Sequence, residues 1–362
     1  MSGTSLDGVD GVLAEFSANG SMRTSASAYL PFPENLRDAL LQLQAPGENE
    51  IHREALAANS LARVYAECVS LVLANAGVAG KQVRAIGAHG QTIRHRPELG
   101  YTRQTNNAAL LAELTGIDVI ADFRSRDIAA GGQGAPLVPA FHQAVFGNNS
   151  EIRVVANIGG ISNISVLNRG QNIIGFDTGP GNVLLDAWIS RHQGVSYDDG
   201  GAWAASGKEI ADLLAEMMTE PYLSLPPPKS TGRDLFHAGW LDAKLAAHLA
   251  APPADVQATL AAFTAQTLAD AVAKHAYEAT AVFVCGGGAY NRYLMQRLQQ
   301  ALNERKLGAQ VKSTSDLGIS PNHVEALAFA WLAYRHTEGQ AGNLPSVTGA
   351  NGLRVLGAKY PA

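Results

Sequence analysis

Residues 152–168, "IRVVANIGGISNISVLN", decide how the whole chain is interpreted. An apolar run, a glycine pair at 159–160 and a second apolar run predict two strands joined by a turn. Residues 1–16, "MSGTSLDGVDGVLAEF", have the same ingredients: glycine, small hydroxyl residues, an acid, and then an apolar strand. The two hairpins indicate an internal duplication, and so a chain built from two similar halves.

Strands and helices alternate after each hairpin, which favours an α/β protein. A helix is expected over 54–77, with Leu61, Val64, Cys68, Leu71 and Val72 on its apolar face, and a second long helix over 255–276. Residues 225–234, "LPPPKSTGRD", predict a long loop. We expect two domains, 1–130 and 131–342, with the tail 343–362 packing back on the first.

The composition excludes several classes of protein. A length of 362 residues suits about two domains, and 46% hydrophobic residues are enough for a sizeable core. The net charge of −5, without a basic block, argues against a nucleic-acid partner. With only two cysteines we expect no disulfide framework, and we expect neither a signal peptide nor a membrane span, so we predict a cytoplasmic protein.

The glycine turns are candidates for phosphate binding, because glycine lets backbone N–H groups approach an anion closely. Asp7 and Asp10 could hold Mg²⁺ through water. A third cluster, "VFVCGGGAYN" at 282–291, follows a strand and precedes a helix, where a base or ribose could lie. Any one of these turns could be an ordinary structural turn without a ligand. The presence of all three in one chain favours a nucleotide-binding site. The sequence contains neither a P-loop motif nor the Rossmann glycine pattern.

Four further stretches carry candidate catalytic or binding groups. Asp177, in "GFDTGPGN", is expected in a loop at a strand end, as a general base or as a helix cap. "AHGQTIRH" at 88–95 offers neutral groups for sugar hydroxyls, or simply a loop histidine. Arg126 in "DFRSRDIAAGGQGAP" could bind an anion or belong to a surface ion-pair cluster. Glu325 opens a late helix, where the helix dipole alone would favour it.

Taken together, the motifs resemble one family, the anhydro-N-acetylmuramic acid kinases, and they span nearly the whole chain. The resemblance rests on "MSGTSLDGVD", "GAHGQTIRH", "DFRSRDIAAGGQGAPLVP", "NIGGISNI", "GFDTGPGN", "PPKSTGRDLF", "CGGGAYN" and "SPNHVEALAFAWLA". It implies a two-domain actin-like ATPase (ribonuclease H-like) fold with ATP in the interdomain cleft. It also implies a homodimer.

The reaction implied by the resemblance is phosphorylation of 1,6-anhydro-N-acetylmuramic acid by ATP with Mg²⁺. Water opens the 1,6-anhydro bridge and O6 is phosphorylated, which gives N-acetylmuramic acid 6-phosphate in cell-wall (peptidoglycan) recycling. Asp177 is the expected base, and Asp7 the expected metal-associated residue. For the sugar we expect His89, Gln91, Thr92, Arg126 and Glu325. For the nucleotide we expect Gly3, Thr4, Ser5, Leu6, Asp7, Gly8, Val9, Asp10, Asn157, Gly159, Gly160, Ser162, Gly286, Gly287, Gly288 and Asn291.

Two other functions compete with this reading. A different sugar kinase would use Asp177 to deprotonate a free hydroxyl, and a non-enzymatic ATP switch would hydrolyse ATP without a sugar. Members of the family carry a short apolar strand before the Met-Ser-Gly of the first turn, so we expect a version extended upstream to bind ATP more tightly.

Overall fold

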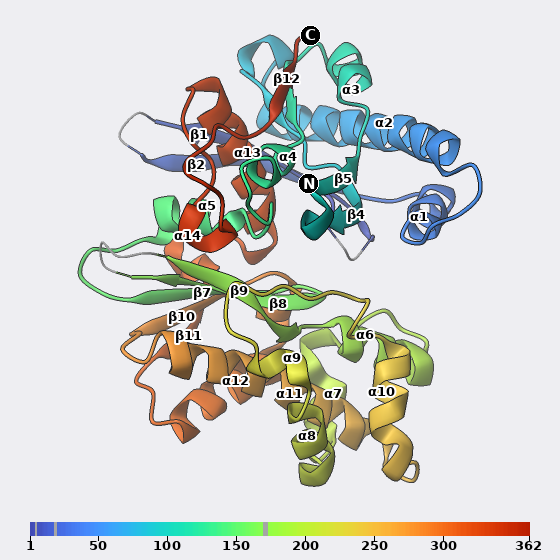
Figure 1. The fold of residues 1–362 in the computed structure, drawn as a ribbon, viewed down its shortest axis with the longest axis vertical. Helices are drawn as coiled ribbons and strands as arrows, with labels where there is room; N and C mark the ends of the chain where they lie inside the picture. The colour runs from blue at the N-terminus through green and yellow to red at the C-terminus, as the bar shows by residue number, and fades with distance from the viewer. Residues whose placement is uncertain (4–5, 18–19, 169–172) are drawn as a thin grey trace. The chain divides into compact units, whose positions relative to one another are not determined.

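The computed structural model describes residues 1–3, 6–17, 20–168 and 173–362. They form two compact units, residues 1–145 with 322–362 and residues 146–321. The sequence prediction assigned 131–145 and 322–342 to the second domain, whereas their contacts lie in the first unit. The elements of each unit appear in Figure 1.

The second unit contains one five-stranded sheet, in the order β11-β10-β7-β8-β9. Its elements are β7 (Arg153–Ile158), β8 (Ile161–Leu167), β9 (Ile174–Pro180), α6 (Val183–Gln193), α7 (Ala202–Ser206), α8 (Ala211–Met218), α9 (Pro221–Ser224), α10 (Ala238–Lys244), α11 (Pro253–His275), β10 (Ala281–Cys285), α12 (Arg292–Glu304) and β11 (Gln310–Ser313). β7, β8 and β9 pair antiparallel, while β10 lies parallel to both β7 and β11. Three antiparallel strands followed by two parallel ones beside the first are the ribonuclease H-like arrangement, so the predicted fold class is confirmed.

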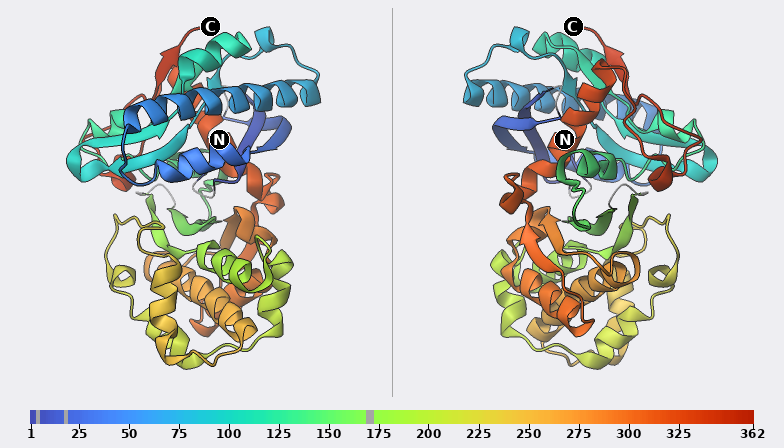
Figure 2. Two further views of the ribbon diagram at one scale, coloured as in Figure 1. Left: turned by 90° about the vertical axis from the view of Figure 1, so that its right-hand side faces the viewer. Right: turned by 90° about the vertical axis from the view of Figure 1, so that its left-hand side faces the viewer.

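One face of this sheet forms the core of the unit. Val154, Ala156 and Ile158 point to that face and pack with Phe176 and with Phe263 of α11. The helices gather on this side of the sheet, as both views in Figure 2 show. Because side chains alternate along a strand, the residues between them face the other way. The candidate residues of β7 and β9 are on that opposite face.

The first unit is built around a long helix and several short sheets. Its elements are β1 (Gly8–Phe16), β2 (Met22–Pro31), α1 (Glu34–Gln42), α2 (Glu50–Ala76), β3 (Ile86–Gly87), β4 (Gln91–Arg96), β5 (Tyr101–Thr105), α3 (Ala108–Thr115), β6 (Val119–Ala121), α4 (Ser125–Ile128), α5 (Val138–Phe146, ending at the unit boundary), α13 (Val324–Thr337), α14 (Pro345–Thr348) and β12 (Ala358–Tyr360). β1 pairs with β2 and β4 with β5, and β6 lies between β3 and β12.

Helix α2 packs one face against the β1–β2 hairpin. Leu61, Val64, Cys68 and Val72 are buried there as predicted, but Leu71 is 40% exposed, because it lies one residue off the buried stripe. A Cβ on Gly11 would lie 2.8 Å from both Cys68 Sγ and a methyl of Val72, so the helix approaches β1 closely. By length and composition α2 could cross a membrane, yet 44% of its apolar stretch is buried inside the protein.

Helix α13 and the C-terminal strand explain why 322–362 belong to the first unit. A Cβ on Gly87 of β3 would lie 2.2 Å from the carbonyl oxygen of Phe329 in α13, so the two backbones touch. β12 pairs antiparallel with β6. The return of the tail 343–362 to the first domain was expected, whereas the contact of α13 with β3 was not; both join segments more than 200 residues apart in sequence.

Candidate active site

The N-terminal turn of the first unit is held by its own backbone and by β1. Met1 and Asp10 exchange two hydrogen bonds, the terminal ammonium donating to Asp10 O over 2.8 Å and Asp10 N donating to Met1 O over 2.9 Å. Leu6 N donates to Gly3 O, and Leu6 has a φ of +57°. Thr4 and Ser5, two predicted nucleotide-binding residues, lie outside the described residues. Among the rest, Asp7 is exposed, Asp10 is half-buried and Gly8 and Val9 are buried in β1.

Two predicted sugar-binding residues contact this turn instead of standing apart from it. Gln91 Nε2 donates to Gly3 O over 3.0 Å, and His89 Nδ1 lies 3.2 Å from Ser2 O. Arg124 donates to His89 Nε2 over 3.1–3.2 Å, and because arginine can only donate, the histidine proton is on Nδ1. Burial lowers the pKa of His89 well below its ordinary value, and the Arg124 guanidinium adds to this. His89 is therefore neutral at pH 7.

Three carboxyl groups interact in the first unit. Burial raises the pKa of Asp10 to about 6; the N-terminal ammonium opposes this rise, and the carboxyl groups of Asp7 and Glu325 add to it. Glu325 lies in the first turn of α13, as predicted. Carboxylates that repel one another in this way are the kind of oxygen donors that Mg²⁺ prefers. No cluster of three metal-binding side chains is found among the described residues, so a role for Asp7 and Asp10 in holding Mg²⁺ stays a prediction.

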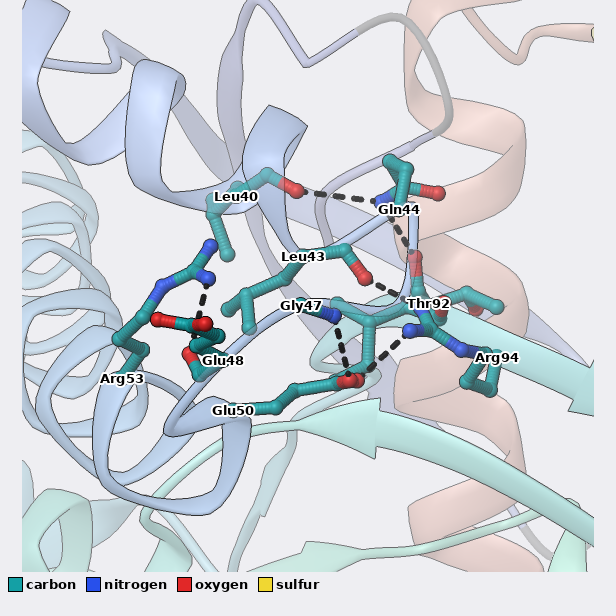
Figure 3. A network of polar contacts seen from close by, with 10 residues as sticks. Leu40, Leu43, Gln44, Gly47, Glu48, Glu50, Arg53, Thr92 and Arg94 are labelled. Atoms are coloured by element: carbon teal, nitrogen blue, oxygen red, sulfur yellow. Dashed lines mark hydrogen bonds and ion pairs between the residues drawn. The ribbon is translucent and has the colours of Figure 1, made fainter.

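Thr92 lies on a strand that is fixed to the α1–α2 connection (Figure 3). Gln44 Nε2 donates to Thr92 O over 3.1 Å, and Arg94 bonds Glu50 over 2.7 Å and also donates to Leu43 O. The Gln44 contact uses the backbone carbonyl of Thr92, and the half-buried Thr92 side chain accepts a hydrogen bond from Gln104 Nε2 over 3.2 Å. The β4–β5 hairpin that carries these residues was not predicted.

The glycine-rich stretch 122–136 contains an exposed arginine, Arg126, next to a buried aspartate, Asp127, that anchors the loop through hydrogen bonds. Arg126 is exposed on α4, whereas Asp127 is fully buried. Asp127 accepts hydrogen bonds of 2.8 Å each from Gly134 N, Asn343 Nδ2 and Thr348 Oγ1. The sequence prediction missed this anchor, which ties the loop to the C-terminal segment; an acid inside an apolar "DIAA" run was the available signal.

In the second unit, the 159–160 turn is seated on the start of α6. The backbone N–H groups of Gly181, Asn182 and Val183 donate to the carbonyl oxygens of Gly159 and Gly160 over 2.8–3.1 Å. On the other side there is room, since a Cβ would lie 3.7 Å from its nearest neighbour at Gly159 and 3.9 Å at Gly160. The turn is thus rigidly held with its glycines accessible, as a phosphate-binding turn needs to be.

The 286–288 glycines divide into two that pack and one that is open. A Cβ on Gly286, whose φ is +77°, would lie 2.5 Å from Asn157 Oδ1, and one on Gly288 would lie 2.4 Å from a methyl of Ile158. Gly287 is exposed and has no neighbour within 3.6 Å of the same position. Packing therefore requires Gly286 and Gly288, and Gly287 is the one available to a ligand.

Two other predicted nucleotide residues, Ser162 and Asn291, are packed within the fold. Asn291 Oδ1 accepts the Leu294 N–H over 2.9 Å and caps α12. Ser162 is fully buried, and its Oγ faces Gly181, where an added Cβ would lie 2.9 Å away. Both positions have a role in folding, and their contact with a nucleotide stays a prediction.

Asp177 lies inside β9, not in the loop after it, so this detail of the prediction is wrong. β9 continues to Pro180 because a bulge at Thr178 keeps it paired with β8: Asn163 is opposite Asp177, and Ser162 is opposite Gly179. Asp177 also does not cap α6, whose N-cap is Asn182. Its Oδ2 accepts the Thr231 N–H over 3.0 Å, and its carbonyl accepts the Tyr222 hydroxyl over 2.7 Å.

A family model described as anhydro-N-acetylmuramic acid kinase matches residues 1–362. The chain belongs to this family. The anhydro-N-acetylmuramic acid kinase of Burkholderia cenocepacia is 60% identical over 362 residues, covering all of this chain and 95% of the relative. That of Cupriavidus pinatubonensis is 60% identical over 368 residues, covering all of this chain and 97% of the relative. An activator of 2-hydroxyisocaproyl-CoA dehydratase from Clostridium difficile with bound ADPNP aligns at a TM-score of 0.46 and 12% identity over 91% of this chain and 97% of that one, which adds no argument.

Within this kinase the sequence prediction missed the partners of Asp177. Asn163 is its register neighbour on β8, and Asn157 is in turn opposite Asn163 on β7, so the three polar side chains cross adjacent strands on one face. Thr231 and Lys229 come from the loop "PPKSTGRD". Both residues lie in the motif "PPKSTGRDLF", which carries part of the family resemblance but assigns neither of them a role.

Proposed function

We propose that this kinase uses ATP to convert 1,6-anhydro-N-acetylmuramic acid into N-acetylmuramic acid 6-phosphate. The observation that carries the proposal is the family match over residues 1–362, at about 60% identity to named relatives. Phosphorylation of this sugar places the enzyme in peptidoglycan recycling and amino sugar metabolism. We further propose that it acts in the cytoplasm, as a homodimer.

The proposed reaction begins with Asp177 as the general base. The anhydro sugar has no proton on O6, so the base takes a proton from water, and the water oxygen bonds to the anomeric carbon. The bond from that carbon to O6 breaks, and O6 then attacks the γ-phosphorus of ATP in line while ADP leaves. The Thr231 N–H on Oδ2 favours the charged carboxylate that this role requires.

The nucleotide is proposed to bind through accessible backbone in both units. In the second unit Gly159, Gly160 and Gly287 combine accessibility with fixed geometry, and Asn157 supports the glycine loop. In the first unit residues 3–10 supply the other phosphate turn. Asp7, with Asp10 beside it, would hold Mg²⁺, which neutralises phosphate charge when bound.

The sugar is proposed to contact His89, Gln91, Thr92, Arg126 and Glu325. His89 and Gln91 also hold the turn at Ser2 and Gly3 through hydrogen bonds. Replacing either one would therefore disturb the phosphate turn along with the sugar. Arg126 is the residue of this set whose exposed side chain is best suited to meet the substrate carboxylate.

ADP release with two candidate sugar acceptors, and with ATP alone, tests the proposal. The anhydro sugar should drive ADP release, N-acetylmuramic acid should not, and ATP alone should give only background. Activity on N-acetylmuramic acid and none on the anhydro sugar would instead support a kinase for free hydroxyls. Slow ATP hydrolysis unaffected by either sugar would support an ATP switch.

A further inference from the structure

The loop that holds Asp177 runs alongside β9 without being part of the sheet. Asp177 N donates to Lys229 O over 3.2 Å, and Thr231 N donates back to Asp177 Oδ2 over 3.0 Å. Residues 225–231 form neither helix nor strand. The orientation of the Asp177 carboxyl group therefore depends on whatever keeps this loop in place.

The ammonium group of Lys229 fixes the loop. Its Nζ donates to the carbonyl oxygens of Tyr222 and Leu223 at the end of α9, over 3.2 and 3.0 Å. It also lies 4.6 Å from the centre of the Tyr222 ring and 5.7 Å from that of Phe176. Hydrogen bonds from a charged group and contacts with aromatic faces are among the stronger polar interactions in proteins. Lys229 thus joins α9 and β9 to its own loop.

Tyr222 completes the connection from the other side. Its ring lies beneath the Lys229 ammonium, and its hydroxyl donates to Asp177 O over 2.7 Å. Lys229 and Tyr222 both interact electrostatically with Asp177, and Lys274 and His275 line a cavity of about 80 Å³ together with Lys229. Burial lowers the pKa of Lys229, and Lys274 lowers it further.

We propose that Lys229 is a positioning residue that holds the Thr231 N–H against the carboxylate of Asp177, with Tyr222 as the bridge between them. Without the ammonium group the loop loses its bonds to α9, and Oδ2 loses its donor. Asp177 would then be both less well aimed and easier to protonate, since a carboxylate that loses an N–H donor and a nearby cation has a higher pKa. This inference rests on the proposed role of Asp177.

The test is Lys229→Met in the full chain, which removes the charge and keeps the stem, with Lys274→Met as the matched control. Lys229→Met should lower kcat about 10- to 100-fold with the KM for ATP within about 2-fold. The acid limb of its kcat profile should move up by about one pH unit. Lys274→Met should keep the wild-type kcat and profile. Tyr222→Phe should also lower kcat and move the acid limb of the kcat profile up, in both cases by less than Lys229→Met.

A double variant separates this inference from the proposed function. Asp177→Asn/Lys229→Met should be no slower than Asp177→Asn alone, because Lys229 acts through Asp177. The positioning role would be overturned if folded Lys229→Met kept the wild-type kcat and acid limb. It would also be overturned if the double variant had a lower kcat than Asp177→Asn alone. An active Asp177→Asn enzyme would overturn the proposed base itself, whatever Lys229→Met does. If Lys229→Met does not fold, Tyr222→Phe decides, and an unchanged acid limb in it contradicts the inference.

Discussion

Asp177 is the residue on which the proposed chemistry depends, and its strand position makes it a well-fixed base. Asp177→Asn keeps the size and can still accept the Thr231 N–H, but it cannot take a proton. We expect kcat to fall by a few orders of magnitude, about 10²- to 10⁴-fold, with ATP affinity nearly unchanged. Steady-state kinetics and nucleotide titration check this. Asp242→Asn, in an exposed ion pair with Arg191, is the control and should be near wild type. A rate near wild type for Asp177→Asn would remove it from the base role.

His142 in α5 gives a prediction about stability and pH. It is 1% exposed, and burial lowers its pKa to about 3, against about 6.5 in an unfolded chain. Because the unfolded state takes up the proton first, stability present above pH 6.5 is lost as the pH falls toward 3. From pH 7 to 5 this loss reaches about 2 kcal/mol. Between pH 7 and 5 the free energy of unfolding of His142→Leu should fall by about 2 kcal/mol less than that of the wild type, as measured by urea unfolding. His52→Leu, on the exposed side of α2, should behave as wild type, and an equal loss in His142→Leu would contradict the argument.

At this scale the sequence identifies reactive groups but not the groups that orient them. Asp177 and the glycine turns could be picked out by residue type and neighbours. Thr231 and Lys229 could not, because they reach Asp177 through a loop more than 50 positions away and use backbone atoms that any residue possesses. Ser162 and Asn291 are residue types that often bind ligands, yet Asn291 caps α12 and Ser162 is fully buried beside Gly181.

At the scale of elements, the contact between α13 and β3 is a close backbone approach in the first unit. Gly87→Ala would put a methyl group 2.2 Å from the Phe329 carbonyl oxygen, so helix and strand must separate. We expect a cost of about 1–3 kcal/mol, seen as a melting temperature several degrees lower. Gly80→Ala makes the same change where the nearest atom is 3.5 Å away and should be nearly neutral. Equal melting temperatures for the two variants would show that α13 does not pack this tightly.

Elements with a local pattern were predictable, and pairings between distant strands were not. The helices at 50–76 and 253–275 and the β7–β8 hairpin follow from patterns within a single stretch. The apolar runs around residues 86 and 119 predict strands, and β3 and β6 form there, whereas the pairing of β6 with β12 joins distant segments that no local pattern connects. The bulge that keeps Asp177 inside β9 is likewise a property of the pairing with β8.

For the whole molecule, the order of strands was predictable through resemblance, but the extent of each unit was not. The chain returns to its first unit at residue 322, and no linker-like stretch of sequence marks this boundary. The reason is physical: α13 is apolar on the side that covers β1 and β3, and a helix belongs where its apolar face is buried.

The central claim is that water opens the anhydro bridge while ATP phosphorylates O6. Turnover in ¹⁸O-labelled water, followed by mass spectrometry of the sugar product, tests it most directly. We expect N-acetylmuramic acid 6-phosphate with one ¹⁸O on the anomeric carbon and none in the phosphate group. A phosphorylated sugar without ¹⁸O at that carbon, or label in released inorganic phosphate with the sugar unchanged, would contradict it.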